Sequence, residues 1–245
     1  MPFTFSHPAI ILPLRYLPKS WFSLTALVIG SMTPDFEYFL RMKVKSDYSH
    51  TLAGIFWFDL PIALLFSFAF HNVIRNLLFQ NLPSFISNRV SIFTHFNWNI
   101  YFRKNWHIII LSLLIGISSH IFWDAFTHQQ GYFVNKINAL KNTIILFEKE
   151  IPIWKIAQHA STLAGSIIIV LVFFKLPKNS TLKTSIDKLY WSTVFLFSTS
   201  ILFIRFTLNP DILNIGNLTV SFIASFIIST TVIPLLIKFK SGIKN

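Results

Sequence analysis

Cysteine, glycine and charged residues are all scarce in this 245-residue chain. It contains no Cys, seven Gly and nine Asp and Glu, and 12% of its residues are charged. The absence of Cys excludes disulfides and thiolate ligands, so a bound metal would have to be held by His and carboxylate side chains. With so few glycines and no Walker-type motif, a phosphate site built from backbone amides is not expected. The sequence also shows no Ser-His-Asp motif in a recognisable setting.

Apolar residues, by contrast, are abundant. Hydrophobic residues make up 53% of the chain, 28 of the residues are Phe, and the mean hydropathy is +0.59. This composition is too apolar for an ordinary soluble domain and indicates an integral membrane protein. A transmembrane helix needs about 20 predominantly apolar residues. Runs of about this length predict five spans, at residues 52–75, 106–126, 156–174, 189–208 and 216–237.

The N-terminal region contains a shorter apolar run. Residues 21–32 are followed at once by Thr33-Pro34-Asp35, which predicts a new helix with Thr33 as its N-cap and Pro34 at its first position. We interpret this region as a half-span or broken helix, in which residues 5–18 and 20–32 form a hairpin that enters the bilayer and returns.

The predicted fold is therefore all-α: a polytopic integral membrane helical bundle with about five full spans and an N-terminal broken or re-entrant helical hairpin. We expect residues 1–245 to form a single membrane domain. Within it, residues 1–175 would be the site-bearing helical core, and residues 176–245 would add two C-terminal membrane helices.

The net charge of +12 is explained better by membrane topology than by nucleic acid. Its Lys and Arg residues lie in the connections between apolar runs and do not form a basic stripe with polar readers, so no nucleic-acid partner is expected. The connections 76–105 and 175–188 and the C-terminal tail carry a modest excess of these residues. A short interfacial helix is expected in the connection 76–105. The positive-inside rule then places the C-terminus in the cytoplasm, with the protein in the cytoplasmic (inner) membrane.

The most informative stretch is residues 116–128, where His120, Asp124 and His128 recur every four residues. In a helix these positions fall on one stripe, with neighbouring Cβ atoms about 5–6 Å apart, which is suitable for metal ligands. A charged group at bilayer depth costs about 2.5–3.5 kcal/mol on insertion scales and usually marks a functional site. The stretch therefore predicts a metal site at one end of a span.

Other polar residues are expected at the same, extracytoplasmic face. If the five spans alternate in direction, His50 at the start of the first span and His159 at the start of the third meet the end of the second span. Asp35 and Glu37 lie shortly before His50 in the chain, and His7 joins this face if the N-terminal hairpin forms. This convergence of residues distant in sequence is the main argument for a site.

Four segments together resemble a known signature: Ser6-His7-Pro8, Pro34-Asp35-Phe36-Glu37, Ser49-His50-Thr51, and Gly116-x2-Ser119-His120-x3-Asp124-x2-Thr127-His128. They resemble the bacterial membrane-bound metal-dependent hydrolase family and related uncharacterised integral-membrane families. That pattern is in turn similar to the all-helical zinc-dependent phospholipase C and P1-type nuclease group, whose ligands follow the order His, Asp, His, His-x3-Asp, His, His-x3-Asp. The resemblance covers about residues 6–165. Carried over by order, it implies metal-ligand roles for His7, Asp35, His50, His120, Asp124, His128 and His159.

The resemblance further implies that Asp124 bridges two metals. Two departures from the pattern argue against a third metal ion. Leu163 stands where the last carboxylate would be, and the N-terminal Trp ligand of the soluble group is missing. One or two ions are therefore expected.

The chemistry of this ligand set favours zinc and would also accept manganese or ferrous iron. A catalytic ion keeps a coordination position for water, which can attack an ester or phosphoester. Glu37, two residues from Asp35, is the candidate general base or outer partner of a ligand. The predicted function is a membrane-embedded, metal-dependent hydrolase acting on a lipid or phosphoester at the extracytoplasmic membrane surface, with membrane lipids as its partners.

Two other functions remain open on the sequence alone. In a non-catalytic membrane protein, the His and Asp residues would form a structural metal site or a hydrogen-bonded staple between helices. In a small transporter, polar residues should continue toward the cytoplasm, where Asp59 and His71 are the available candidates. His71 lies near the opposite end of its span, and His95 and His107 flank an aromatic, basic stretch typical of a membrane interface. These three histidines are therefore given no part in the site.

Overall fold

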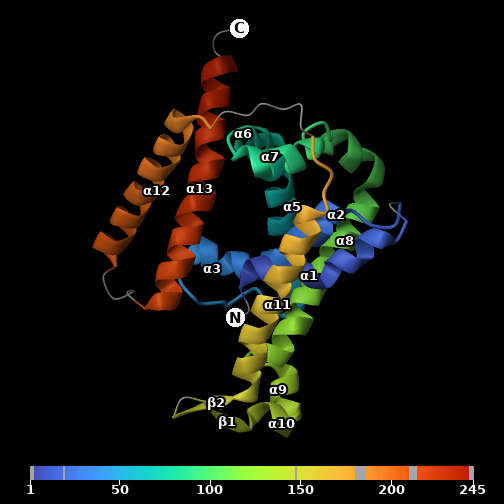
Figure 1. Ribbon diagram of the computed structural model, residues 1–245, viewed down its shortest axis with the longest axis vertical. Coiled ribbons are helices and arrows are strands. Elements are labelled where there is room, and N and C mark those ends of the chain that lie inside the picture. The colour runs from blue at the N-terminus through green and yellow to red at the C-terminus, as the bar shows by residue number, and fades with distance from the viewer. Residues whose placement is uncertain (1–2, 19, 147, 180–185, 210–213, 243–245) are drawn as a thin grey trace. The chain divides into compact units, whose positions relative to one another are not determined.

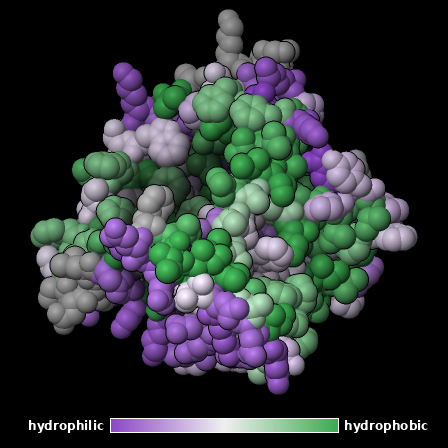
Figure 2. Space-filling model, turned by 60° about the horizontal axis from the view of Figure 1, so that its bottom comes forward, coloured by the Kyte–Doolittle hydropathy of each residue, from purple (hydrophilic) through white to green (hydrophobic). Residues whose placement is uncertain are grey.

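The computed structural model describes residues 3–18, 20–146, 148–179, 186–209 and 214–242, most of which are helical (Figure 1). Part of the connection 175–188 and the end of the C-terminal tail, both used in the charge argument, lie outside these residues. Among these described residues, five helices are long and apolar enough to cross a membrane, and each contains most or all of one of the five predicted runs. Figure 2 shows hydrophobic side chains over much of one face, interrupted by hydrophilic patches. The five candidate helices are Leu52–Gln80, Trp98–Lys136, Ile153–Phe174, Lys188–Leu208 and Ile215–Phe239.

The N-terminal segment consists of short helical pieces. They are η1 (Thr4–Ser6), α1 (Pro8–Ile11), η2 (Leu12–Tyr16), α2 (Leu24–Met32), η3 (Thr33–Asp35) and α3 (Phe36–Arg41). Ser23 caps α2 by accepting a hydrogen bond from the Ala26 backbone N–H. The prediction that Thr33 caps a new helix is wrong: its backbone is helical, and its hydroxyl donates to the carbonyl of Ile29, 2.7 Å away. The chain instead continues through one tight turn into α3.

The first candidate span changes its helical pitch twice. It contains α4 (Leu52–Gly54), the π-helical turn η4 (Ile55–Asp59), α5 (Leu60–Ala69), a second π-helical turn η5 (Phe70–Ile74) and α6 (Arg75–Gln80). Pro61 lacks an N–H and cannot bond the carbonyl four residues earlier, so a wider turn just before it relieves this conflict. Such turns are frequent at functional sites.

The connection to the second span contains the short helix predicted there, α7 (Ser84–Val90), followed by η6 (Ser91–Phe93). Helix α8 (Trp98–Thr127) then runs for 30 residues, with a non-helical backbone at Asn105.

Within the described residues, the one feature that departs from an all-helical fold lies between α8 and α11. After α9 (Tyr132–Lys136) and α10 (Asn138–Lys141), strands β1 (Thr143–Leu146) and β2 (Lys149–Pro152) form an antiparallel pair, with Thr143 opposite Pro152 and Leu146 opposite Lys149. The consecutive apolar residues Ile144 and Ile145 favour extended backbone. Glu148 has a φ of 62°, as expected in a tight hairpin turn.

Three long helices complete the chain: α11 (Ile153–Phe174), α12 (Lys188–Leu208) and α13 (Ile215–Gly242). Helices α12 and α13 pack side by side, where Ser198 donates to Ser229 over 2.8 Å (Figure 1). Small polar residues of this kind are typical of contacts between membrane helices.

The described residues form two compact units that are interleaved along the chain. Unit 1 consists of Met1–Asp35, Tyr48–Leu64 and Asn105–Lys175, and unit 2 of Phe36–Asp47, Leu65–Lys104 and Leu176–Asn245. All seven predicted metal ligands belong to unit 1, whereas Glu37 belongs to unit 2. Helices α12 and α13 also belong to unit 2. The prediction of a single membrane domain stays a prediction.

Candidate metal centre

Two glycines allow α2 and α8 to approach each other within unit 1. A Cβ placed on Gly30 would lie 2.5 Å from the carbonyl oxygen of Leu113, and one on Gly116 would lie 2.5 Å from that of Leu27. Both distances are shorter than any carbon–oxygen contact, so only glycine fits at this crossing. The close approach places the carbonyl of Ser31 at the end of α2, 2.7 Å from Nδ1 of His120 on α8.

Four side chains converge beside this crossing. Nε2 of His50 lies 3.6 Å from Oδ1 of Asp35 and 3.4 Å from Oδ2 of Asp124. Nε2 of His120 lies 3.5 Å from Oδ1 of Asp35 and 3.3 Å from Oδ2 of Asp124. One ligand atom from each of the four residues lies within 4.8 Å of all the others. Residues as far apart as Asp35 and Asp124 in sequence thus present two nitrogens and two oxygens to one point.

These separations match the edges of a zinc tetrahedron. Zinc bonds of about 2.0–2.2 Å place neighbouring tetrahedral ligand atoms about 3.3–3.6 Å apart, because the edge is about 1.63 times the bond. An octahedral magnesium site with bonds of about 2.0–2.1 Å would need about 2.8–3.0 Å between adjacent ligands. Four of the six edges in this group measure 3.3–3.6 Å. The donor set and its spacing therefore fit a tetrahedral ion such as zinc.

The same distances argue against a hydrogen-bonded staple. Hydrogen bonds from N–H to O are normally 2.7–3.2 Å long. Nε2 of His120, Oδ1 of Asp35 and both carboxylate oxygens of Asp124 are buried and have no hydrogen-bond partner among the described residues. Leaving a buried polar atom unsatisfied costs about 1–3 kcal/mol, and more for a charged group. Several such atoms aimed at one point form a cluster that could bind a metal ion.

Outer contacts hold three of the four ligands in this orientation. The hydroxyl of Thr4 donates to Oδ2 of Asp35 over 2.5 Å, which leaves Oδ1 for the site. The carbonyl of Ser31 accepts from Nδ1 of His120, and the Ser49 hydroxyl lies 2.9 Å from Nδ1 of His50. A histidine whose Nδ1 is engaged in this way presents Nε2 to a metal, and such partners are typical of metal-binding histidines.

His50 has an uncommon backbone conformation. Its φ is 60°, in the left-handed region that residues other than glycine rarely adopt. This conformation costs roughly 1–2 kcal/mol and is concentrated at functional sites. Thr51, the next residue, caps α4 by accepting from the Gly54 N–H. The turn therefore directs His50 into the site immediately before the helix begins.

Two further histidines approach the other oxygen of Asp124. Nε2 of His7 lies 3.6 Å from Oδ1, and Nδ1 of His128 lies 3.5 Å from the same atom. The His7 ring stacks on that of His120, with centroids 3.7 Å apart. Nδ1 of His128 also lies 3.1 Å from the Asp124 carbonyl, and its Nε2 is buried without a hydrogen-bond partner among the described residues. Each oxygen of Asp124 thus faces its own pair of histidines.

Two of the three predicted ligands outside the spans have protonation states that suit metal binding. Burial, with a smaller contribution from His120, lowers the pKa of His7 to about 3, so its ring is neutral at pH 7. Burial raises the pKa of Asp35, but the adjacent His120 and His50 rings together outweigh this effect and hold it below its ordinary value. For His50, burial lowers the pKa and the carboxylates of Asp124 and Asp35 raise it, with a net increase. A metal ion at His50 would therefore have to displace a proton.

His159 and Glu37 are placed differently from these residues. His159 is exposed on α11, outside the group of four, while its neighbour Gln158 is buried and donates to the Thr127 carbonyl over 3.2 Å. Glu37 is buried in unit 2, where its carboxylate pairs with Arg41 at 2.7 Å and accepts from the Asp47 N–H at 2.9 Å. The structure thus gives Glu37 an organising role in the turn after α3. Its role as a general base stays a prediction.

Sequence reasoning missed the outer contacts of the site. Thr4 carried one usable signal, since it lies three residues before His7 and its hydroxyl can serve a carboxylate. The carbonyl of Ser31 carried none, because a backbone acceptor is invisible in sequence. The only sequence signal for the close approach of α2 and α8, which positions this carbonyl, was the pair of glycines at positions 30 and 116, one in each apolar helix.

A family model described as "Domain of unknown function (DUF4184)" matches residues 1–235 of the chain. The chain belongs to this family. No curated protein and no solved structure matches it. The DUF4184 match spans all seven predicted ligands, the first four candidate spans and most of the fifth, and its description assigns no activity. The resemblance to metal-dependent hydrolases therefore remains an expectation from the sequence.

Proposed function

We propose that this DUF4184 protein is an integral-membrane, metal-dependent hydrolase that acts on a lipid or phosphoester at the membrane surface. The observation that carries the proposal is the buried group of Asp35, His50, His120 and Asp124, whose ligand atoms have the spacing of a tetrahedral zinc site. A site of this kind inside an otherwise apolar chain is expensive to maintain, which favours a functional role.

Zinc is the ion that the ligand set suits best, with one or two ions bound. Asp35, His50, His120 and Oδ2 of Asp124 would hold the first. Oδ1 of Asp124, with the rings of His7 and His128 beside it, would hold the second, and Asp124 would then bridge the two. A bound divalent ion supplies Lewis-acid activation of water and of the substrate oxygen at neutral pH.

In the proposed reaction, the oxygen of water forms a bond to phosphorus or to the ester carbon as the bond to the leaving oxygen breaks. The proton released by water ends on that leaving oxygen. Within the site, the neutral ring of His7 has a buried Nε2 with no hydrogen-bond partner among the described residues, so it can carry this proton when it does not hold a second ion. Glu37 is the second candidate for this role, on sequence grounds.

The two competing functions have less support. A hydrogen-bonded staple would have N–H to O distances shorter than those at Asp35 and Asp124. A transporter would need a polar path through the span, but its candidate His71 receives a hydrogen bond from Arg75 over 2.9 Å and stacks on Trp98 at 4.6 Å. These contacts are those of a residue that fixes local packing.

We further propose that the protein lies in the cytoplasmic membrane with its C-terminus inside and the metal centre at the extracytoplasmic surface. The excess of Lys and Arg in the connection 76–105 and the C-terminal tail supports this orientation. The chain contains no Cys, so single cysteines can be introduced directly for labelling by a membrane-impermeant maleimide. Labelling from outside at position 145, in the exposed β1 strand, is expected. Labelling at that position only after lysis would indicate the opposite orientation.

The metal assignment is tested by elemental mass spectrometry of detergent-purified protein, with the wild type beside the double variant His120→Ala/Asp124→Ala. Near-stoichiometric zinc or manganese that disappears in the double variant supports the proposal. Phospholipids and soluble phosphodiesters are then screened with metal-loaded and chelator-treated protein. A wild type that binds no metal even after reconstitution refutes the metal centre, and metal-loaded protein that cleaves neither class refutes the hydrolase.

A further inference from the structure

An apolar groove opens at the surface of unit 1 beside the metal centre. It has a volume of about 170 Å³ and lies between α1, α8 and α11. Its walls are formed by Ile10 of α1, Trp123 of α8, and Ala164 and Ile168 of α11, and His7 also lines it. The His7 ring stacks on that of His120, and its Nε2 lies 3.6 Å from Asp124, so this one residue connects the groove with the centre.

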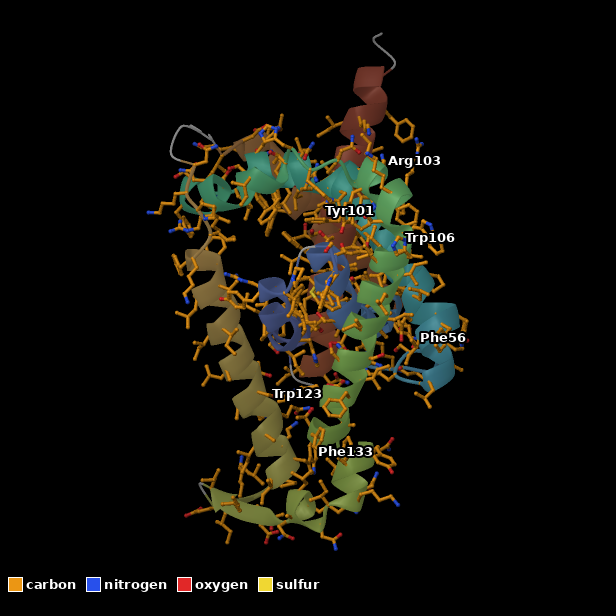
Figure 3. The ribbon with its side chains drawn as sticks, turned by 90° about the vertical axis from the view of Figure 1, so that its right-hand side faces the viewer. Phe56, Tyr101, Arg103, Trp106, Trp123 and Phe133 are labelled. Atoms are coloured by element: carbon orange, nitrogen blue, oxygen red, sulfur yellow. The ribbon has the colours of Figure 1, made fainter. Side chains whose placement is uncertain are left out.

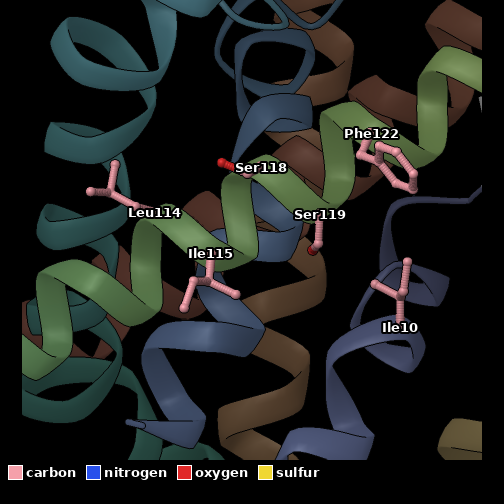
Figure 4. Close-up of a pocket in the computed structure, with 6 residues that line it drawn as sticks. All are labelled: Ile10, Leu114, Ile115, Ser118, Ser119 and Phe122. Atoms are coloured by element: carbon pink, nitrogen blue, oxygen red, sulfur yellow. The ribbon is translucent and has the colours of Figure 1, made fainter. Parts of the chain in front are cut away.

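A second, wider depression of about 480 Å³ adjoins the first. Ile10 lines both, and Figure 4 shows it opposite Ile115, Ser119 and Phe122 along α8. Trp123 projects from the part of α8 that faces α11 (Figure 3). The two hollows together form a track along α8, with Ile10 at its midpoint and His7 at one end.

The lining of this track is mostly apolar, with the hydroxyl of Ser118 among its few polar groups. The hydroxyls of Ser6, Ser119 and Ser161 each donate to a backbone carbonyl close by in the chain, at 2.7, 2.7 and 3.0 Å. A sugar or nucleotide needs directed hydrogen-bond donors in its site, and its burial without them is costly. Hydrocarbon has no such need. The chemistry of the walls therefore selects an apolar chain.

The track also opens toward the region that lipid would occupy. Helix α11 is buried over only 11% of its apolar window, the lowest share among the candidate spans together with α12. Ile168 is 43% exposed and Phe122 is 53% exposed. Apolar side chains exposed to this extent along a candidate span face hydrocarbon. A chain can thus enter sideways without leaving the bilayer.

We propose that this track holds one hydrocarbon chain of the substrate, which makes the substrate a membrane amphiphile whose scissile ester or phosphoester bond lies next to the head group. This inference rests on the proposed hydrolase function and narrows it, because a soluble phosphodiester has nothing to place in the track. With the chain between Ile10 and Ile168, the head group meets the His7 end, where Asp124 and the ligand histidines lie.

The test uses the full-length protein in bilayer discs of phosphatidylethanolamine and phosphatidylglycerol. The discs contain a phosphatidylethanolamine with a diazirine on one acyl chain. After illumination, labelled peptides are mapped by mass spectrometry, and metal content is measured on the same samples. The blocking variant is Ala164→Phe, which fills the groove. The matched control is Leu163→Phe, which places the same side chain at the adjacent, 64% exposed position outside the groove. Ile168→Trp blocks the groove from a second position.

We expect a several-fold excess of label on the peptides that contain Ile10 and Trp123. That excess should be lost in Ala164→Phe and Ile168→Trp and kept in Leu163→Phe, with metal content unchanged in all three. Label spread evenly over the exposed faces of α11 and α12, and insensitive to the blocking variants, would overturn the inference.

The two proposals fail in different ways in this experiment. Metal-loaded protein without groove labelling refutes the hydrocarbon track and leaves the metal centre standing. Groove labelling on wild-type protein that holds no metal refutes the metal-dependent hydrolase, and the substrate inference that rests on it falls as well.

Discussion

Replacing Asp124 by Asn should weaken metal binding more than any other single isosteric change in the chain. The substitution keeps the shape of the side chain and removes its negative charge. Asp124 is 6% exposed, and its two oxygens lie 3.3–3.6 Å from ring nitrogens of His7, His50, His120 and His128. Asn offers one weaker oxygen ligand in place of two anionic ones, so the ion at Oδ2 and any ion at Oδ1 are both affected.

The magnitude follows from the number of ligands. Structural zinc sites bind with about 10–16 kcal/mol in total, or roughly 2.5–4 kcal/mol for each of four ligands. Since about 1.4 kcal/mol corresponds to a tenfold change, loss of one ligand should weaken zinc binding about 10²–10³-fold. The assay is competition for zinc with a chromophoric chelator in detergent, at fixed pH and salt.

The matched control is Asp59→Asn, which neutralises a fully buried aspartate of another candidate span in unit 1. This variant should keep wild-type affinity, because Asp59 is outside the group of four ligands. An Asp124→Asn protein that binds zinc as tightly as the wild type would show that Asp124 is not a ligand. Equal losses in both variants would show that the effect reflects membrane insertion and not coordination.

Three further predictions concern the support of the site. Gly116→Ala would push a Cβ against a backbone carbonyl of α2, so we expect thermal unfolding to show destabilisation by about 1–3 kcal/mol, together with metal loss. The control Gly216→Ala should unfold almost like the wild type, because the nearest contact of its new Cβ is a side chain at 3.1 Å. Thr4→Val removes the hydrogen bond to Oδ2 of Asp35 and should weaken zinc binding about 10–100-fold, and calorimetric titration that finds no change would exclude this orienting role. Because the pKa of His50 is raised and a proton competes with the ion there, zinc affinity should fall by up to about tenfold per unit as the pH drops from about 8 to about 6, and a pH-independent affinity would contradict this.

Much of the helical framework was predictable, because apolar length alone identifies a helix that can cross a membrane. All five predicted runs correspond to candidate spans, and the helix in the connection 76–105 was also expected. The β1–β2 hairpin was not, since four-residue strands in a polar connection carry little periodic signal. Thr33 was misassigned because its hydroxyl serves equally well as a cap acceptor or as a donor to the preceding turn, and only the backbone path decides between them.

At the site, helical spacing and the family resemblance predicted a set of seven ligands that includes the four residues the structure brings together, Asp35, His50, His120 and Asp124. The spacing of four along α8 is a property of the helix and needs no tertiary information. Which pair of histidines lies beside each oxygen of Asp124 could not be predicted, because it depends on side-chain torsions. The left-handed backbone of His50 and the Ser31 carbonyl depend in the same way on how separate segments meet.

The scattered origin of the ligands also has a consequence for biogenesis. His7, Asp35 and His50 are synthesised first, and about 70 residues separate His50 from His120. At about 5–20 residues per second, the ribosome needs roughly 4–14 s to supply the second half of the site. During that interval the early segment carries a carboxylate and two imidazoles without the groups of α8 that complete the site. The nascent protein should therefore hold its N-terminal segment at the membrane surface until α8 has been synthesised.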